Sequence, residues 1–234
     1  MRVSVIIPVY NEKKTVLQIL KRVQAVKIEK EIIVIDDGST DGTRKVLEEK
    51  FKNNGKVRFI FHSRNLGKGA AVRSGLNEIT GEVVIIQDAD LEYDPKDFLK
   101  LLAPIKEGKT EVVYGSRFLG RRLRIFGKNS TPMPLHWVAN KILVWSTNLL
   151  FGSKITDMET GYKVFTKKVA GSLRWKANRF DFEPEVTAKV LKAGYKIMEI
   201  PIDQKPRGYK DGKKITWKDG IAAFYTLFKY RLVD

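Results

Sequence analysis

Two hydrophobic patterns alternate along the first half of the chain. Short runs of consecutive Val and Ile residues alternate with segments in which apolar side chains recur every three or four positions, as Val16, Ile19, Leu20 and Val23 do. The runs are typical of strands in a parallel sheet that is covered on both faces, and the spaced pattern is typical of amphipathic helices. We therefore predict strands at 3–9, 31–35, 57–61, 82–87 and 112–115, and helices at 15–26, 43–51, 68–79 and 97–105.

This order of strands and helices predicts an α/β fold, with right-handed βαβ units and a mostly parallel central sheet flanked by helices. In such sheets, ligands bind beyond the carboxyl ends of the strands. Polar turns follow three of the predicted strands: Tyr10-Asn11-Glu12, Asp36-Asp37 and Asp88-Ala89-Asp90. We expect these turns to converge on one cleft, although they are far apart in the sequence.

The pattern changes after about residue 118. The second half predicts helices at 137–151, 183–193 and 221–230, a strand at 195–200, and basic segments at 120–127 and 201–218. The sequence shows no internal repeat, no low-complexity tract and no Gly/Ser-rich linker. We therefore expect a single domain over residues 1–234, with a C-terminal elaboration after residue 117.

Composition limits the chemistry of any site. The chain has 234 residues, no cysteine and two histidines, which excludes a disulfide framework, a thiolate zinc site and a cysteine nucleophile. A multi-histidine metal site is disfavoured as well, so oxygen ligands would have to hold any metal.

Basic residues are concentrated in the second half of the chain. The net charge is +17, of which residues 118–234 contribute +13 and residues 1–117 contribute +4. Such a cationic half indicates an anionic partner, which can be nucleic acid, lipid headgroups or a phosphorylated substrate. A solvated, lysine-rich surface of a heat-adapted protein is the other interpretation.

The N-terminus lacks the long apolar segment and the cleavage site of a signal peptide. The longest charge-free apolar stretch near the middle of the chain, 142–153, is shorter than the ~20 residues that a membrane-spanning helix needs. We therefore expect a cytoplasmic protein, either free or bound to a membrane surface.

The acidic turn Asp88-Ala89-Asp90 directly follows the apolar run VVII. It can be a simple polar exit from the strand. On an extended segment, however, Asp88 and Asp90 would share a face and repel each other, a conflict that a divalent cation removes. Mg²⁺ and Mn²⁺ prefer carboxylates, waters and substrate phosphates, so we expect a metal that bridges the protein to a diphosphate. The sequence contains neither an ATP-type phosphate loop nor a dinucleotide fingerprint.

Successive motifs carry a family resemblance. SVIIPVYNE, VIDDGSTDGT, NLGKGAAVRSGL, DADLEYDP and YGSRF resemble, in this order, the signatures of family 2 glycosyltransferases with the GT-A (Rossmann-like) fold. DMETGYKVF, FDFEPEVTAKVLKAGYKIMEIPI and PRGYKDGKKITWKDG resemble the branch of polyprenyl-phosphate sugar transferases that includes dolichyl-phosphate mannose synthase. The resemblance implies a nucleotide-sugar-binding half at 1–117 and an acceptor-side half at 118–234.

The resemblance also implies roles for individual residues, carried over position by position. The implied nucleotide-binding residues are Pro8, Tyr10, Asn11, Glu12, Asp36, Asp37, Lys68 and Asp88. The implied ligands of Mg²⁺ or Mn²⁺ are Asp88, Asp90 and Glu92, of which Asp90 is the most direct. The implied acceptor-phosphate residues are Arg117, Ser130, Arg207 and Lys213.

Several of these roles stay open at this stage. Asp157 falls where many inverting relatives have a catalytic base, but Asp157 or Glu159 can instead orient the sugar or pair with a basic residue. Lys68 can reach a phosphate or pair with an acid of the cleft, and the glycines beside it allow a ligand to approach the backbone. The catalytic candidates are Asp90, Arg117 and Asp157.

The implied reaction is an inverting transfer of a hexose from GDP-mannose or a UDP-hexose to a polyprenyl (dolichyl-type) phosphate. The enzyme would dock at the cytoplasmic face of a membrane through its helices at 137–151 and 221–230 and the basic residues that flank them. One alternative is transfer to a sugar hydroxyl, with Asp157 as the base. A nucleic-acid-binding protein is a remote alternative, because the aromatic residues are not interleaved with the basic run.

Overall fold

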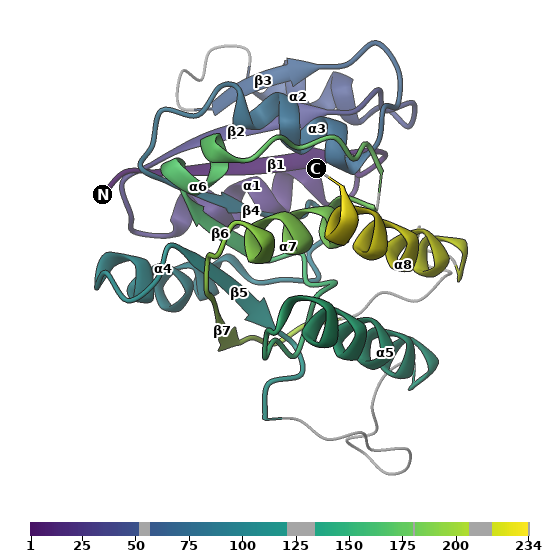
Figure 1. Cartoon of the computed structure of the whole chain (residues 1–234). Helices are drawn as coiled ribbons and strands as arrows, with labels where there is room; N and C mark the ends of the chain where they lie inside the picture. The colour runs from purple at the N-terminus through teal and green to yellow at the C-terminus, as the bar shows by residue number, and fades with distance from the viewer. Residues whose placement is uncertain (52–56, 121–133, 180, 206–216, 234) are drawn as a thin grey trace.

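A computed structural model of the chain describes residues 1–51, 57–120, 134–179, 181–205 and 217–233. It shows a seven-stranded sheet with the order β3-β2-β1-β4-β6-β5-β7 (Figure 1). The strands are β1 Val3–Val9, β2 Lys30–Asp36, β3 Val57–Phe61, β4 Val83–Ile86, β5 Val112–Ser116, β6 Lys163–Thr166 and β7 Ile197–Pro201. All pairs are parallel except those of β6, which runs antiparallel to β4 and β5. The predicted α/β fold with a mostly parallel sheet is confirmed.

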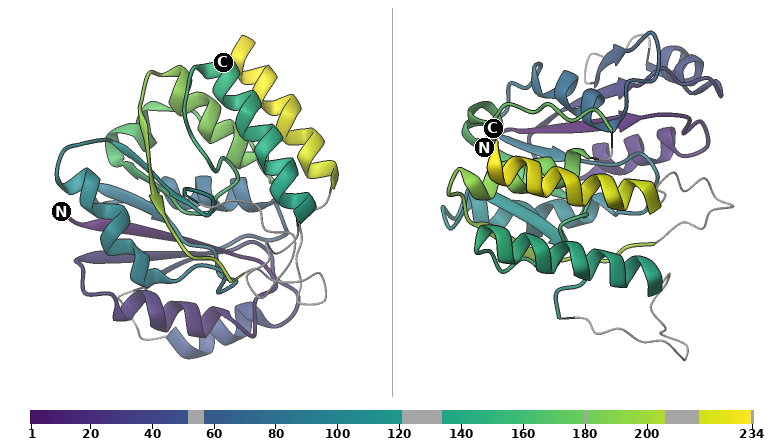
Figure 2. Two further views of the ribbon diagram at one scale, coloured as in Figure 1. Left: turned by 90° about the horizontal axis from the view of Figure 1, so that it is seen from below. Right: turned by 45° about the vertical axis from the view of Figure 1, so that its right-hand side comes forward.

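Helices cover both faces of this sheet (Figure 2). One face packs against α1, α2 and α4, and the other against α3, α6 and α7, while α5 and α8 form a further layer against α7. The helices are α1 Val16–Ala25, α2 Thr43–Phe51, α3 Lys68–Leu76, the 3₁₀ helix η1 Pro95–Asp97, α4 Phe98–Lys106, α5 Pro134–Phe151, α6 Lys167–Ser172, α7 Phe182–Lys192 and α8 Trp217–Leu232.

The strand β1 shows why a continuous apolar run is needed. Val5 and Ile7 point into the cluster on the α1 side, and Ile6 points into the cluster on the α3 side. Side chains alternate between the two faces of a strand, so a strand covered on both faces has no solvent-facing position. In the part of the chain that the structure describes, no helix combines the length and the apolar character needed to cross a membrane.

Three elements were not predicted: β6, the short helix α6 and the 3₁₀ helix η1. The segment that forms β6, KVFT, has only four residues and begins with a lysine, so its pattern does not indicate a buried strand. Lys163 is nevertheless fully buried, because Glu183 on α7 neutralises its charge. Tertiary pairing therefore decides this strand, not local pattern.

The sheet order brings the polar turns together. The central strand β1 pairs with β2 through Val9 and Asp36, and with β4 through Ile6 and Ile86. The turns that follow these three parallel strands therefore leave the same edge of the sheet side by side, as predicted; that they line one cleft stays a prediction. The end of β5 and the segment before the antiparallel β6 lie at this edge as well, because β5 and β6 pair in opposite directions.

Candidate active site

The turn after β1 is joined to the turn after β2. Asn11 has a left-handed backbone conformation, with φ of 52°, which Asn tolerates better than most residues. Its Oδ1 accepts from the backbone N–H of Thr40 at 2.8 Å, and its own N–H donates to Oγ of Ser39 at 2.9 Å. The backbone N–H of Glu12 donates to Oγ1 of Thr43 at 3.0 Å. Asn11 and Glu12 thus fix the turn after β1 against the segment after β2. Their contact with a nucleotide stays a prediction.

The two acids at the end of β2, Asp36 and Asp37, have different surroundings. The carboxylate of Asp37 accepts from the backbone N–H groups of Leu66 and Gly67 at 2.9 and 2.7 Å, and contacts Nδ1 of His62 at 2.7 Å. Asp37 therefore holds the loop before α3 in place.

Asp36 is fully buried, and among the described residues only one of its oxygens has a hydrogen-bond partner. Its Oδ2 pairs with the guanidinium of Arg44, with distances of 3.0 Å to Nε and 2.9 Å to Nη2. No described residue donates to its Oδ1, although that atom is buried. A buried acceptor without a donor costs free energy, so Asp36 is better suited than Asp37 to receive a donor group from a ligand.

The glycines before α3 serve a contact within the protein. Gly67 has φ of +100°, and a Cβ added there would lie 2.3 Å from the carbonyl oxygen of Asn178. A Cβ on Gly69 would lie 2.4 Å from the carbonyl oxygen of Ala177, and the N–H of Ala70 donates to Asn178 O at 3.1 Å. The space that the sequence assigned to a ligand at Gly67 and Gly69 is occupied by protein backbone, which corrects that expectation.

Lys68 pairs with two acids of the cleft, one of the two roles left open by the sequence. Its ammonium lies 2.8 Å from Oδ1 of Asp88 and 2.9 Å from Oε1 of Glu183. Burial disfavours the charged form, but the two carboxylates more than offset this and raise the pKa of Lys68. Lys68 is therefore an ammonium that links α3 to the ends of β4 and α7.

Asp88 directly precedes a turn and Asp90 lies on it, so the two are not on one extended segment as expected. Leu91 has φ of 65°, and Oδ1 of Asp90 accepts from the backbone N–H of Glu92 at 3.0 Å. The carboxylate of Glu92 accepts from Nε2 of Gln204, so this acid is engaged with the segment after β7. Without a ligand, the ammonium of Lys68 neutralises the carboxylate of Asp88.

The residues at this turn suit a divalent cation that a substrate completes. Among the described residues, no group of three or more His, Cys, Asp or Glu side chains is arranged to hold a metal ion. Mg²⁺ is usually bound by one or two carboxylates together with waters and substrate phosphates, however, and not by an all-protein cage. The half-buried carboxylates of Asp88 and Asp90 match that requirement, and Glu92 matches it less well.

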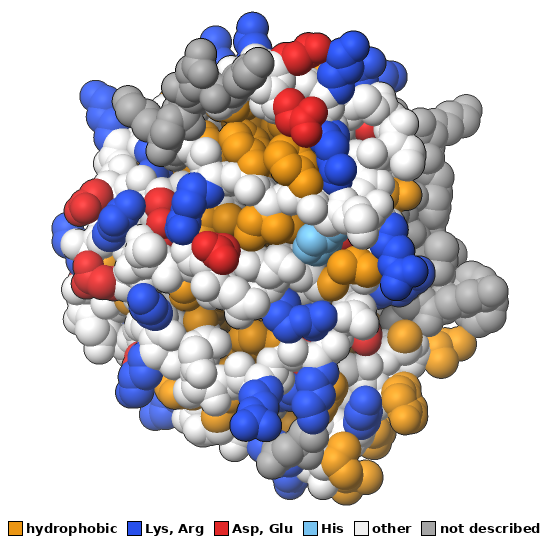
Figure 3. Space-filling model, turned by 90° about the horizontal axis from the view of Figure 1, so that it is seen from above, with side chains coloured by type: hydrophobic (Ala, Val, Ile, Leu, Met, Phe, Trp, Pro, Cys, Tyr) orange, Lys and Arg blue, Asp and Glu red, His pale blue; other side chains and the backbone are white. Residues whose placement is uncertain are grey.

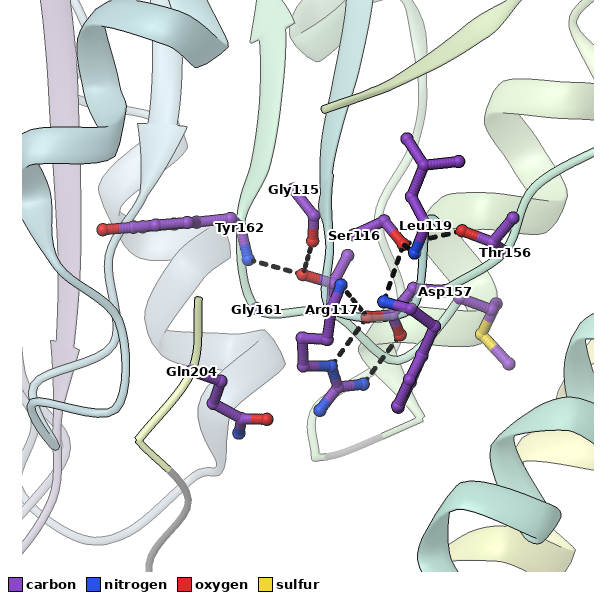
Figure 4. Close-up of polar contacts among 12 residues, drawn as sticks. Gly115, Ser116, Arg117, Leu119, Thr156, Asp157, Gly161, Tyr162 and Gln204 are labelled. Atoms are coloured by element: carbon purple, nitrogen blue, oxygen red, sulfur yellow. Dashed lines mark hydrogen bonds and ion pairs between the residues drawn. The ribbon is translucent and has the colours of Figure 1, made fainter. Parts of the chain in front are cut away.

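Arg117 and Asp157 form a buried ion pair at the end of β5 (Figure 4). Nε and Nη2 of Arg117 donate to the two carboxylate oxygens of Asp157 at 2.6 and 2.7 Å, and the backbone N–H of Arg117 donates to Oδ2 at 2.9 Å. Burial opposes the charge of Arg117, but Asp157 outweighs this and raises the pKa of Arg117. Because Asp157 is fully buried and accepts three donors, its geometry favours the pairing role over that of a proton acceptor.

A third acid, on β7, fixes this pair. The carboxylate of Glu199 accepts from the backbone N–H groups of Thr156 and Asp157, at 2.8 and 2.9 Å, and from Oγ1 of Thr156. Oγ of Ser116 bonds Oγ1 of Thr156 at 2.6 Å and accepts from the backbone N–H of Leu119, as Figure 4 shows. Neither Glu199 nor Glu183 was predicted as a site residue; the available signal was an acid within an apolar strand or helix.

The aromatic ring of Phe118 connects this pair to α5. The guanidinium of Arg117 lies 5.1 Å from the ring centroid, and the ammonium of Lys141 on α5 lies 5.4 Å from it. Both distances are in the range of cation–π contacts. Positive charge and an apolar ring therefore lie together where β5 meets α5.

Glu159 is expected to make stability depend on pH. Burial, together with the neighbouring charge of Glu183, raises the pKa of Glu159 to about 7 against the opposing charges of Lys163 and Arg117. When the pKa of a carboxyl is higher in the folded state, the folded protein becomes less stable as pH rises from the unfolded pKa of about 4.3 through the folded pKa of about 7. Glu159→Gln should therefore unfold like the wild type at about pH 4, below the unfolded pKa, and be more stable at pH 8, by about 1–3 kcal/mol in urea denaturation. Equal differences at both pH values would contradict this assignment.

Several predicted residues lie outside the described part of the chain. They are the acceptor-phosphate candidates Ser130, Arg207 and Lys213. Their roles, like those of the other site residues, stay predictions.

Known proteins resemble the chain both in sequence and in structure. The family model "Glycosyl transferase family 2" matches residues 4–170. The chain is 31% identical to a UDP-N-acetylglucosamine–dolichyl-phosphate N-acetylglucosaminyltransferase of Methanococcus voltae, over 98% of this chain and 96% of that protein. It is 29% identical to an undecaprenyl-phosphate 4-deoxy-4-formamido-L-arabinose transferase of Proteus mirabilis, over 91% of this chain and 62% of that protein.

A solved structure has the same fold. Glucosyl-3-phosphoglycerate synthase from Mycobacterium tuberculosis, in complex with Mg²⁺ and UDP, superposes with a TM-score of 0.73 at 17% identity, covering 99% of this chain and 80% of that one. The family model spans the strand-end turns of the sheet and the Arg117–Asp157 pair, and the whole chain follows the GT-A arrangement. The protein is therefore a glycosyltransferase and belongs to glycosyltransferase family 2.

Proposed function

We propose that this glycosyltransferase moves a hexose from a nucleotide diphosphate sugar to a polyprenyl phosphate at the cytoplasmic face of a membrane. The observation that carries the proposal is the meeting of two features at one edge of the sheet. The acidic turn after β4 lies there beside Lys68, and the cationic Arg117 lies there beside α5. A nucleotide sugar needs the first feature, and a phosphate acceptor needs the second.

The donor side is supported by Asp36 and by the structural neighbour. Oδ1 of Asp36 is a buried acceptor to which no described residue donates. Asp36 ends β2 and pairs with Val9, the residue of β1 directly before Tyr10. A base or ribose N–H or O–H group would satisfy this oxygen. The neighbour of the same fold was solved with UDP and Mg²⁺, which supports a nucleotide and a divalent cation at the corresponding edge.

The acceptor side is supported by Arg117 and by the curated relatives. Two relatives that align with most of this chain are named for transfer to dolichyl phosphate and for an undecaprenyl-phosphate sugar. Arg117 presents a guanidinium whose Nη1 is not bonded to Asp157, and guanidinium groups suit phosphate oxygens. A polyprenyl phosphate is already ionised, so the protein has to position it more than deprotonate it.

Two apolar stripes support contact with a membrane. Among the described residues, the exposed large apolar side chains are Val138, Ile142, Trp145 and Leu149 on α5, and Ile221, Tyr225, Phe228 and Leu232 on α8. Each set repeats at helical spacing, and the two helices pack against each other. Figure 3 shows hydrophobic side chains projecting at the lower right, on the side where Figure 1 places α8. Such amphipathic helices with flanking basic residues bind membrane surfaces.

In the proposed reaction, an acceptor phosphate oxygen bonds to the anomeric carbon of the sugar from one face. The bond from that carbon to the diphosphate breaks on the opposite face, so the nucleotide diphosphate leaves with the electron pair and the configuration inverts. Lys68 would supply positive charge to the departing diphosphate, and Arg117 would supply it to the acceptor phosphate on the other side of the sugar. A divalent cation bound at Asp88 and Asp90 would neutralise further charge on the departing diphosphate.

A transfer assay tests the proposal. UDP-N-acetylglucosamine, UDP-glucose and GDP-mannose are each incubated with a short polyprenyl phosphate, with Mg²⁺, with Mn²⁺ or with chelator. We expect a glycosyl polyprenyl phosphate from one of these donors, with an inverted anomeric configuration by NMR. Transfer only to sugar hydroxyls, with none to the lipid phosphate, would overturn the proposed acceptor.

The stripe residues Trp145 and Tyr225 are expected to control membrane binding. The double variant Trp145→Ser/Tyr225→Ser should bind anionic phospholipid vesicles at least about tenfold more weakly in a sedimentation assay, because two large apolar side chains no longer enter the interface. Leu99→Ser is the matched control, since Leu99 is an exposed apolar residue on α4. Unchanged vesicle binding in the double variant would contradict membrane binding through the apolar stripes of α5 and α8.

A further inference from the structure

The ammonium of Lys68 holds the carboxylate of Asp88 from one side. Its Nζ lies 2.8 Å from Oδ1 and 3.1 Å from Oδ2. On another side, a Cβ added at Gly161 would lie 2.3 Å from Oδ2, so the backbone there closely approaches the same carboxylate. Asp88 therefore has little freedom to turn away from Lys68.

Lys68 is itself anchored deep in the protein. Oε1 of Glu183 lies 2.9 Å from its Nζ, and the other oxygen of Glu183 bonds the ammonium of Lys163. Lys163 is fully buried and also donates to the carbonyl oxygens of Met158 and Thr160, at 3.0 and 2.6 Å. The four groups from Asp88 to Lys163 alternate in sign and balance in charge.

This arrangement works against a cation that arrives alone. A divalent ion bonded to Asp88 would lie within a few ångströms of the Lys68 ammonium, and the two positive charges would repel. A nucleotide diphosphate reduces this repulsion, because the Lys68 ammonium can pair with its negative oxygens and no longer with Asp88. Lysine suits such a transfer, since it carries a compact charge on a flexible stem.

We propose that Lys68 makes metal binding at Asp88 conditional on the nucleotide. The ammonium neutralises Asp88 in the free protein, and it turns toward the diphosphate when the donor binds, which leaves Asp88 and Asp90 for the divalent cation. This inference rests on the proposed function for the diphosphate donor. It adds that Lys68 controls the order in which metal and nucleotide bind.

The test is Mn²⁺ binding, followed by electron paramagnetic resonance, with and without UDP or GDP. In the wild type, we expect weak Mn²⁺ binding alone and binding at least about tenfold tighter with the nucleotide. In Lys68→Met, Mn²⁺ alone should bind at least about tenfold more tightly than it binds to the wild type, and the nucleotide should add less. Lys100→Met is the matched control, because Lys100 pairs with Asp97 at 3.0 Å on the surface.

Lys68→Gln, which keeps a polar head group without the charge, provides a second variant if Lys68→Met does not fold. Circular dichroism establishes folding for both. The inference is overturned if Mn²⁺ alone binds the neutral variants no more tightly than the wild type, or if UDP or GDP binds the wild type and leaves its Mn²⁺ binding unchanged. Failure of the proposed function has a different signature: neither UDP nor GDP binds the wild type with Mn²⁺ present, while the metal titrations of the variants still report on Lys68.

Discussion

Replacing Asp90 with alanine is expected to lower sugar transfer by about 10²–10³-fold while leaving the fold intact. The half-buried Asp90 lies on the turn after β4, where its Oδ1 accepts a local hydrogen bond from the N–H of Glu92. Because its carboxylate is not fully buried, we expect the substitution to cost little stability. It removes the carboxylate that is best placed, next to the lysine-paired Asp88, to hold a cation against the donor diphosphate.

The measurement is kcat/KM for the donor found in the transfer assay, with thermal unfolding of the same protein. Glu82→Ala is the matched control, because Glu82 carries an exposed carboxylate just before β4, at the opposite edge of the sheet. The control should transfer like the wild type. Transfer that persists both in Asp90→Ala and in excess chelator would remove the metal from the mechanism.

Asp157→Asn is expected to lower the free energy of unfolding by about 3–5 kcal/mol as well as the transfer rate. The substitution leaves the buried guanidinium of Arg117 without its counter-charge, and breaking a buried pair by removing one partner costs about this much. The double variant Arg117→Met/Asp157→Asn removes both charges. It should recover part of the stability but none of the activity.

The two roles considered for Asp157 are separated by measuring urea denaturation and kcat/KM. The variants are Asp157→Asn, Arg117→Met and the double variant. A positioning partner of Arg117 predicts coupled losses of stability and transfer. A general base predicts the same loss of stability, because the same ion pair is broken, but a loss of kcat with a hydroxyl acceptor and not with a lipid phosphate. Asp97→Asn is the control, because Asp97 pairs with a partly exposed lysine and should cost less than about 1 kcal/mol.

Much of the fold was predictable because its signals are local. The strands of the first half follow continuous Val and Ile runs; the strands at 3–9 and 57–61 were predicted with their observed bounds, and no boundary of the other three differs by more than one residue. Helix α1 buries Val16, Ile19, Leu20 and Val23, the residues of the predicted apolar face. The strand β6 escaped prediction because the charge of Lys163 is buried only through a partner twenty residues away.

The candidate site was only partly predictable for the same reason. A sequence indicates that acids follow strands, but the tertiary contacts decide what each acid does. Asp36 keeps an oxygen without a described donor, whereas the neighbouring Asp37 accepts two backbone N–H groups of the loop before α3. Gly67 and Gly69 looked like a ligand-binding loop, and they instead admit the backbone of residues 177–178.

The sequence by itself determined the α/β class, the family and the edge of the sheet at which the polar turns meet, because periodicity, strand order and motifs are local properties of the chain. Only the tertiary structure decided which charges are paired: Lys68 with Asp88 and Glu183, and Arg117 with Asp157. The physical reason is that the energy of a buried charge depends on neighbours within a few ångströms, and those neighbours come from segments that the fold alone brings together.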